Sequence, residues 1–172
     1  EKPWLTTCGE SRGLIDGALS VRFKKISRDT KSAMYGNGNS VNPILFNKGR
    51  IMLYGDRTMQ IAESKLSARH SVILTNYIVN GMSTIGQRFV WDPIDDELVL
   101  ELRMAYTKFL QGIESERGIE DYGLIITNTP ETRNRRELIV DVSFIPVEAL
   151  ERLLLNATVR ESGAVLNSVT NA

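Results

Sequence analysis

The chain has 172 residues, a mass of 19.3 kDa and no formal net charge, with 42% hydrophobic and 24% charged residues. This balance is typical of one folded domain with short arms, and it excludes a chain that is disordered throughout. The longest apolar runs, such as 51–54, fall far short of the roughly 20 residues of a membrane-spanning helix, so we expect no membrane span. Because no basic-then-apolar leader opens the sequence, we also expect no signal peptide, and the start at Glu1 indicates a fragment or a processed product.

The sequence offers few residues for catalysis or metal binding. Cys8 is the only cysteine and His70 the only histidine, which leaves no thiolate cluster for zinc and disfavours a histidine-based catalytic array. The glycines at 36–38 are not followed by the Lys-Ser/Thr end of a phosphate-binding loop. Trp4 and Trp91 are predicted to be packing anchors rather than stacking platforms. We therefore predict no catalytic, cofactor-binding or metal-binding residues, and a small monomeric α/β enzyme or binding module is the less favoured alternative.

The charges are unevenly distributed along the chain. Residues 1–60 hold ten Lys and Arg but five Asp and Glu, whereas 91–121 hold nine acidic residues and three basic ones. Unlike patches on a neutral molecule favour head-to-tail association of copies. The alternative is an ordinary solvated surface with chance clustering. The basic group Arg133, Arg135 and Arg136 is weak support for nucleic-acid binding on a neutral chain, so we expect no direct contact with nucleic acid.

The first part of the chain is predicted to be a leader followed by a strand and a short helix. Residues 1–18 are rich in glycine, which favours open turns. Residues 19–26 alternate between apolar and polar side chains, as in a half-exposed strand. Ser27 or Asp29 is expected to cap a short polar helix that ends near Tyr35.

The middle of the chain contains the clearest periodic segments. Two apolar runs at 41–46 and 51–54 predict a strand–turn–strand or one bent strand. Apolar residues three to four apart predict an amphipathic helix over 66–84, with Ser67 as its N-cap, and a second over 95–111. The glycine after the second helix is expected to close it.

The last third is predicted to be mostly β-structure. Segments 122–127 and 138–145 have the alternation of strands, and a polar loop at 128–136 joins them. Segment 150–160 fits either a helix or a strand, and we favour the strand. The small, polar residues 161–172 indicate a tail.

These elements together predict an α/β fold of the α+β type. A mixed β-sheet is covered on one face by the two main amphipathic helices, and extended N- and C-terminal arms flank it. We divide the chain into an N-terminal arm with a strand (1–26), a core domain (27–160) and a C-terminal arm (161–172). Neither arm is expected to fold on itself.

An ordered string of turns and strands resembles one known family. Residues 41–58, VNPILFNKGRIMLYGDRT, are similar to a signature block of contractile-tail sheath proteins. The leader pairs PW at 3–4 and RG at 12–13, and the later segment FVWDP at 89–93, agree with the same family. The resemblance extends over about residues 3–160.

The resemblance implies the conserved C-terminal, inner domain of a phage tail sheath subunit. Such a subunit is structural, is not an enzyme and needs no cofactor. It polymerises around the tail tube and contracts to drive the tube through the host envelope for genome delivery. The implied partners are identical sheath subunits, the tail tube protein, and the baseplate and tail terminator proteins. The implied location is the virion tail, after assembly in the host cytoplasm. Sheaths of type VI secretion systems and of extracellular contractile injection systems share this domain and stay open as alternatives.

The resemblance also implies which residues meet other subunits. In the sheaths that this chain resembles, terminal arms add strands to the sheets of neighbours. The candidate arm positions are apolar: Leu19, Val21, Phe23, Val159, Val165, Leu166 and Val169. A charged helix face is expected to contact the tube, with candidates Arg69, Asp95, Asp96, Glu97, Arg103 and Lys108. The chain departs from the family at 68–71, where Ala-Arg-His-Ser stands in place of a pair of basic residues.

Overall fold

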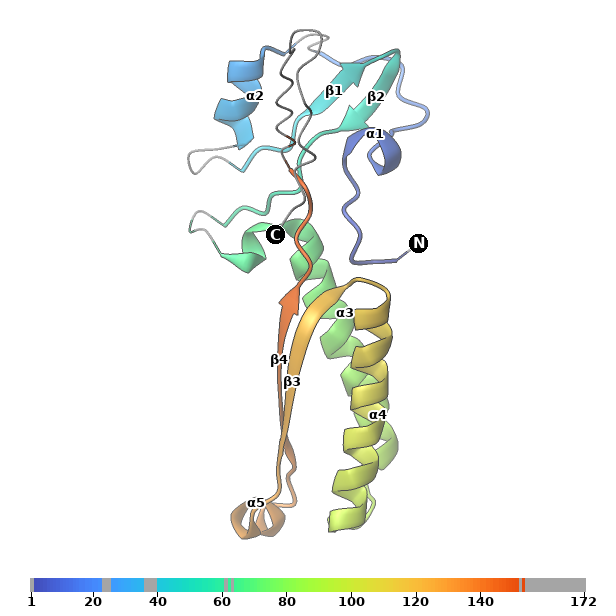
Figure 1. Ribbon diagram of the computed structural model, residues 1–172, viewed down its shortest axis with the longest axis vertical. Helices are drawn as coiled ribbons and strands as arrows, with labels where there is room; N and C mark the ends of the chain where they lie inside the picture. The colour runs from blue at the N-terminus through green and yellow to red at the C-terminus, as the bar shows by residue number, and fades with distance from the viewer. Residues whose placement is uncertain are drawn as a thin grey trace, which may run out of the picture.

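The computed structural model describes residues 2–22, 26–35, 40–60, 62, 64–151 and 153. Figure 1 shows an elongated molecule with two parts. One part combines two antiparallel helices with a long hairpin: α3 (Arg69–Gly86), α4 (Asp96–Ser115), β3 (Ile119–Thr127) and β4 (Ile139–Pro146). The other part contains the smaller elements: α1 (Gly9–Arg12), α2 (Arg28–Tyr35), β1 (Ile44–Asn47) and β2 (Arg50–Leu53).

Helix α4 follows the predicted apolar stripe. Its buried side chains recur every three to four residues, which places them on one face: Leu98, Leu102, Tyr106, Leu110 and Ile113. The Asp95 carboxylate accepts the backbone N–H of Leu98 at 2.8 Å and caps the first turn. The helix predicted over 95–111 is therefore confirmed, although it continues past Gly112 to Ser115.

Helix α3 confirms the helix predicted over 66–84 but begins at Arg69. The prediction of Ser67 as its N-cap is wrong, because Ala68 precedes the helix and makes no side-chain capping bond. Ser67 instead forms a reciprocal cap with Ser64 around the 3-10 turn Lys65–Ser67, in which each hydroxyl bonds the backbone of the other residue. The capping hydroxyl is thus used by this turn before α3 starts.

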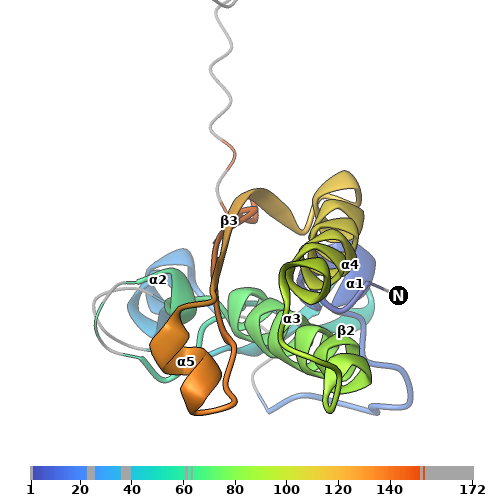
Figure 2. The same ribbon diagram turned by 90° about the horizontal axis from the view of Figure 1, so that it is seen from below.

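The hairpin β3–β4 packs against both helices. Tyr122 lies opposite Phe144, and Leu124 lies opposite Val142. These four side chains share the face that meets the helical core, so the alternate residues face outward. The strands predicted in this region are confirmed, and the polar loop between them contains α5 (Pro130–Asn134). Figure 2, viewed along the molecule, shows the hairpin on one side of the helix pair.

The smaller part also confirms two predictions. β1 and β2 pair through a tight turn in which Lys48 (φ 48°) and Gly49 (φ 81°) both have positive φ, as a two-residue type I′ hairpin turn requires. Helix α2 begins at Arg28, and the Ser27 hydroxyl accepts the backbone N–H of Thr30 at 3.1 Å. The predicted hairpin and the predicted short helix therefore both form.

The strand predicted over 19–26 is not found in its described residues, 19–22 and 26, and 23–25 lie outside the described residues. Just before this segment, Ile15 donates its N–H to the carbonyl of Ile51 on β2 at 2.9 Å. The chain changes direction at Gly17, whose φ is 80°. Residues 19–22 follow this turn and pair with no strand among the described residues. The strand favoured over 150–160 lies outside the described residues except at 150, 151 and 153.

The α+β class and the two main amphipathic helices are confirmed. The described strands, however, form two separate antiparallel pairs and not one mixed sheet. Each pair is closed by its own local connection, so no parallel crossover arises. The 18 residues of α3 span roughly 27 Å and connect the two parts. The main core lies between the helices and β3–β4 and includes Leu74, Ile78, Leu102, Leu110, Ile119 and Ile126.

Candidate assembly surfaces

The β3–β4 hairpin leaves two strand edges unpaired within the described part of the chain, since each strand pairs with the other and with no third strand. Its outward face is apolar at several positions, where Ile125 is 64% exposed and Ile139 and Ile145 are almost half exposed. A two-stranded hairpin with open edges and an exposed apolar face is a ready acceptor for an added strand.

The candidate arm residues are only partly described. Leu19 is fully exposed and Val21 is half-buried. Five further candidates lie outside the described residues: Phe23, Val159, Val165, Leu166 and Val169. The middle of the N-terminal arm is paired within its own chain, because Leu14 forms an antiparallel bridge with Met52 on β2.

The chain that leaves the hairpin runs back across the smaller part. Val147 donates its N–H to the carbonyl of Gly118 at 3.2 Å. Beyond it, Glu148 pairs with Lys65, and Glu151 pairs with Arg57 at 3.1 Å. Two surface ion pairs therefore set the direction in which the C-terminal segment leaves the folded part, next to the exposed side chains of Leu150 and Leu153.

A buried charge cluster joins the smaller part to the start of α3. The Asp56 carboxylate bonds Nδ1 of His70 at 2.5 Å and Nε of Arg69 at 3.2 Å, and it accepts the backbone N–H of His70 at 3.1 Å. Burial alone would raise the pKa of Asp56, but the bonds from His70 and Arg69 outweigh it and hold this pKa below its ordinary value. The same bond from Asp56 raises the pKa of His70 against the opposing effect of burial.

The six candidates for a tube-facing helix do not form one patch. Arg69 lies at the start of α3 and pairs with Asp56 and Thr7. The others lie along α4, whose N-terminus is at the opposite end of the molecule (Figure 1). Asp95 caps α4, and Asp96 pairs with Arg133 at 3.1 Å. The three with exposed side chains and no ion pair among the described residues are Glu97, Arg103 and Lys108.

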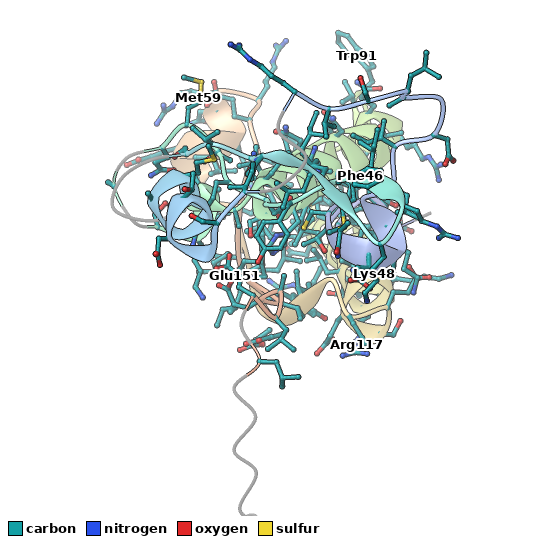
Figure 3. The ribbon with its side chains drawn as sticks, turned by 90° about the horizontal axis from the view of Figure 1, so that it is seen from above. Phe46, Lys48, Met59, Trp91, Arg117 and Glu151 are labelled. Atoms are coloured by element: carbon teal, nitrogen blue, oxygen red, sulfur yellow. The ribbon has the colours of Figure 1, made fainter. Side chains whose placement is uncertain are left out.

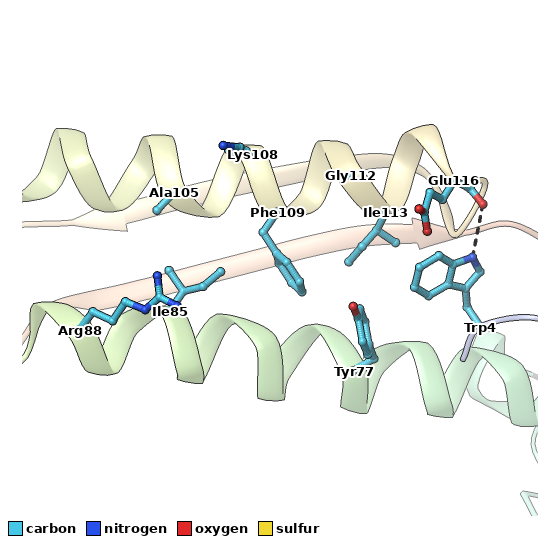
Figure 4. Close-up of a pocket in the computed structure, with 10 residues that line it drawn as sticks. All are labelled: Trp4, Tyr77, Ile85, Arg88, Ala105, Lys108, Phe109, Gly112, Ile113 and Glu116. Atoms are coloured by element: carbon cyan, nitrogen blue, oxygen red, sulfur yellow. Dashed lines mark hydrogen bonds between the residues drawn. The ribbon is translucent and has the colours of Figure 1, made fainter. Parts of the chain in front are cut away.

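A groove of about 480 Å³ opens between α3 and α4 (Figure 4). At one end, Trp4 meets Tyr77 edge-on with 5.5 Å between ring centroids, and Tyr77 stacks on Phe109 at 5.9 Å. The indole N–H of Trp4 donates to the carbonyl of Glu116 at 3.4 Å. The prediction that Trp4 is a packing anchor is thus confirmed, since it is 7% exposed.

The other half of this groove has no aromatic ring in it. Its floor is Ile85 and Ala105, and Arg88 and Lys108 stand at its rim. Phe109 lies between the two halves, and Gly112 follows it on the aromatic side. Sequence periodicity did not reveal the groove, because its lining comes from the leader and from two helices that meet only in the folded chain.

Gly112 provides a stability test of this surface. A Cβ atom added at Gly112 would meet no other atom within 4 Å. Because glycine in a helix interior is less favourable than alanine by about 1 kcal/mol, Gly112→Ala should raise the free energy of unfolding by about that amount. Urea denaturation followed by circular dichroism measures it. Gly81→Ala is the matched control and should lower stability, because its Cβ would overlap the ring of Phe109.

Within the described residues, no three side chains of the types that bind metals come together, and no helix is long and apolar enough to cross a membrane. The described part of this α+β domain has a two-stranded hairpin with unpaired edges beside an antiparallel helix pair, and an open groove between the helices.

No protein-family model and no curated protein sequence matches the chain. Solved structures with the same fold come from contractile injection systems. A chain of the anti-feeding prophage (AFP) baseplate superposes with a TM-score of 0.75 at 15% identity, over 92% of this chain and 46% of the other. A chain of the extracellular contractile injection system PVC, from its sheath complex in the contracted state, gives a TM-score of 0.78 at 19% identity, over 91% and 46%.

A third match, the AFP helical sheath in the contracted state, has a TM-score of 0.75 at 15% identity and covers 91% of this chain and 45% of the other. The chain thus spans less than half the length of these structures' chains. At this identity the likeness establishes the fold, which this chain shares with components of contractile injection systems.

Proposed function

We propose that this chain is the inner part of a contractile sheath subunit, which polymerises around a tail tube and contracts to drive the tube through an envelope. The observation that supports this most is the agreement of two independent lines. The block at 41–58 resembles sheath proteins in sequence, and the whole fold superposes on sheath chains at a TM-score of up to 0.78.

The free edges of β3–β4 supply the proposed mechanism of assembly. Residues near 158–170 of one subunit, and the exposed part of the N-terminal arm of another, add strands to the hairpin of a neighbour. Main-chain hydrogen bonds give the affinity, and alternate side chains such as Ile125 and Ile139 fix the register. Subunits joined through these arms rotate and slide past one another while the strand pairing is kept, so contraction proceeds without loss of connectivity. The driving free energy is stored when the extended sheath assembles, and no nucleotide is consumed.

A phage tail is the particle that we favour, with the tail tube, baseplate and tail terminator proteins as partners and the virion as the final location. A sheath of an extracellular contractile injection system is the second candidate, and the matches to the AFP and PVC assemblies favour it. Electron microscopy of particles from producing cells separates the two. Tails joined to a DNA-filled capsid support a phage, and free contractile particles without capsids support an injection system.

Assembly itself is tested on the full-length subunit. We expect regular tubes by electron microscopy, and we expect their loss when 161–172 is deleted or when Val165, Leu166 and Val169 are all replaced by Asp. The matched control places Asp at Ser162, Asn167 and Asn171, which adds the same charge but keeps the apolar side chains, and should still assemble. Ordered tubes from the deleted protein, or a full-length protein that stays monomeric at high concentration, would show that the arms do not join subunits.

A further inference from the structure

The open half of the groove has charge and shape that nothing in the described chain uses. Arg88 and Lys108 are exposed at its rim and form no ion pair among the described residues. Ile85 and Ala105 are half-buried beneath them. Two cations over an apolar floor fit a ligand that combines an apolar anchor with negative charge.

The exposed residue Gly112 indicates that another protein chain approaches the backbone of α4 closely. The two glycines of α3 are required by contacts within the chain, because a Cβ at Gly81 would overlap Phe109 and a Cβ at Gly86 would lie 2.6 Å from the Tyr106 hydroxyl. Gly112 is exposed in α4, and open space surrounds it. The space that a side chain would fill here is left free in the groove next to Phe109, as expected where another chain comes close to the backbone.

An anchor of the required kind lies elsewhere on the same chain. Trp91 is 98% exposed, and Figure 3 shows its ring extending away from the body of the molecule. Its φ of 86° is strained for a large side chain, and such strain is concentrated at functional positions. Val90 beside it is 55% exposed, and the exposed Asp92 forms no ion pair among the described residues. The prediction that Trp91 is a packing anchor within its own chain is therefore wrong.

We propose that the turn at Val90–Asp92 of one copy docks into the groove at Gly112 of the next copy, with the Trp91 indole against Phe109 and Gly112 and with Asp92 beside Arg88 and Lys108. The groove already holds an indole at its other end, where Trp4 packs on Tyr77. The turn lies at the end of the molecule where α4 begins, whereas Gly112 lies near the end of α4. One copy therefore cannot fill its own groove through this turn.

A contact between two different surfaces of the same chain is heterologous, so it leaves one turn and one groove free at the ends of every dimer. Repeated contacts of this kind close into rings or grow into open helical filaments. The role of this contact rests on the proposed function, because in a sheath it would add a side-chain contact between subunits to their strand pairing. The contact itself can be tested without that function.

The test uses two single variants of the 172-residue chain and their mixture, studied by sedimentation velocity over a concentration series. Trp91→Ala removes the anchor but keeps the groove, and Gly112→Leu fills the groove but keeps the anchor. Each variant alone should associate at least roughly thirtyfold more weakly than the wild type, the effect of losing a central aromatic contact. An equimolar mixture should form a 1:1 dimer that grows no further, because one working turn and one working groove remain.

Two controls make the result specific. Gln111→Leu adds the same side chain at the neighbouring exposed position of α4, outside the groove, and should leave association unchanged. Reversal of charge at Lys108→Glu or Asp92→Lys should weaken association, and the double variant should restore it, which only a contact between copies explains. A monomeric wild type at millimolar concentration, or a mixture that stays monomeric, would overturn the inference. Deletion of 161–172 should not affect this dimer, so the strand-exchange mechanism can fail while the present contact holds.

Discussion

Replacement of Asp56 by Ala should lower the free energy of unfolding by about 3–5 kcal/mol, because it removes one partner of a buried charge pair and leaves the other without compensation. The side chains of Asp56 and His70 are each only 6% exposed, so water cannot replace the lost bonds. A loss of this size is a large share of the 5–15 kcal/mol that stabilises a typical domain, and it lowers Tm by roughly 10 °C in a protein of this length. Thermal and urea unfolding followed by circular dichroism measure it.

The pH dependence of stability separates this cluster from a purely steric effect. The folded-state pKa of His70 is raised above 6.5, so its contribution is complete below that pH and is lost as the pH rises through the folded value. The pKa of Asp56 is lowered below 3.8, so its contribution is present above that pH and is lost as the pH falls further. Stability from the pair is therefore largest between about 3.8 and 6.5, and Asp56→Ala should flatten this profile.

The exposed pair of Glu10 and Lys48 is the control for the buried cluster. Its oxygen and nitrogen lie 3.0 Å apart, but both side chains are at least 60% exposed. Glu10→Ala should therefore cost less than about 1 kcal/mol and should leave the pH profile unchanged. Equal losses from Glu10→Ala and Asp56→Ala would contradict the role that we assign to burial.

Leu110→Ala should destabilise the chain by about 2–5 kcal/mol, because it removes three carbon atoms from a fully enclosed position and leaves a cavity. Leu110 is 0% exposed and lies at the centre of the core between α4 and the hairpin. Leu100→Ala is the same substitution in the same helix at a position that is 56% exposed, and it should change stability by less than about 0.5 kcal/mol. Urea denaturation of the two variants side by side measures the difference, and similar losses at both positions would contradict the packing described.

The elements that the sequence predicts well are those with local, periodic signals. The apolar stripe of α4 lies within one segment, and the alternation of β3 and β4 needs only the rule that successive side chains face opposite ways. The turn at Lys48–Gly49 is likewise visible from a glycine between two apolar runs. These features could be predicted because neighbours in sequence determine them.

The features that could not be predicted depend on segments far apart in the chain. From the sequence, Arg69 is a candidate for contact with the tube. In the folded chain the Asp56 carboxylate lies next to Arg69 and forms an ion pair with it. Trp4 and Trp91 are both predicted to be packing anchors, yet Trp4 is buried and Trp91 is exposed. The sequence also contains enough strands for one sheet, and only the path of the chain along α3 shows that they form two pairs.

The turn between α4 and β3 holds both the N-terminal leader and the segment that follows the hairpin. Trp4 of the leader bonds the carbonyl of Glu116, and two residues further on the carbonyl of Gly118 accepts the N–H of Val147, just after the hairpin. Glu116 and Gly118 are separated by one residue, so the two attachment points are adjacent in the backbone. The leader and the segment after the hairpin are therefore held by the same three residues of backbone, so a displacement of one segment acts directly on the turn that holds the other.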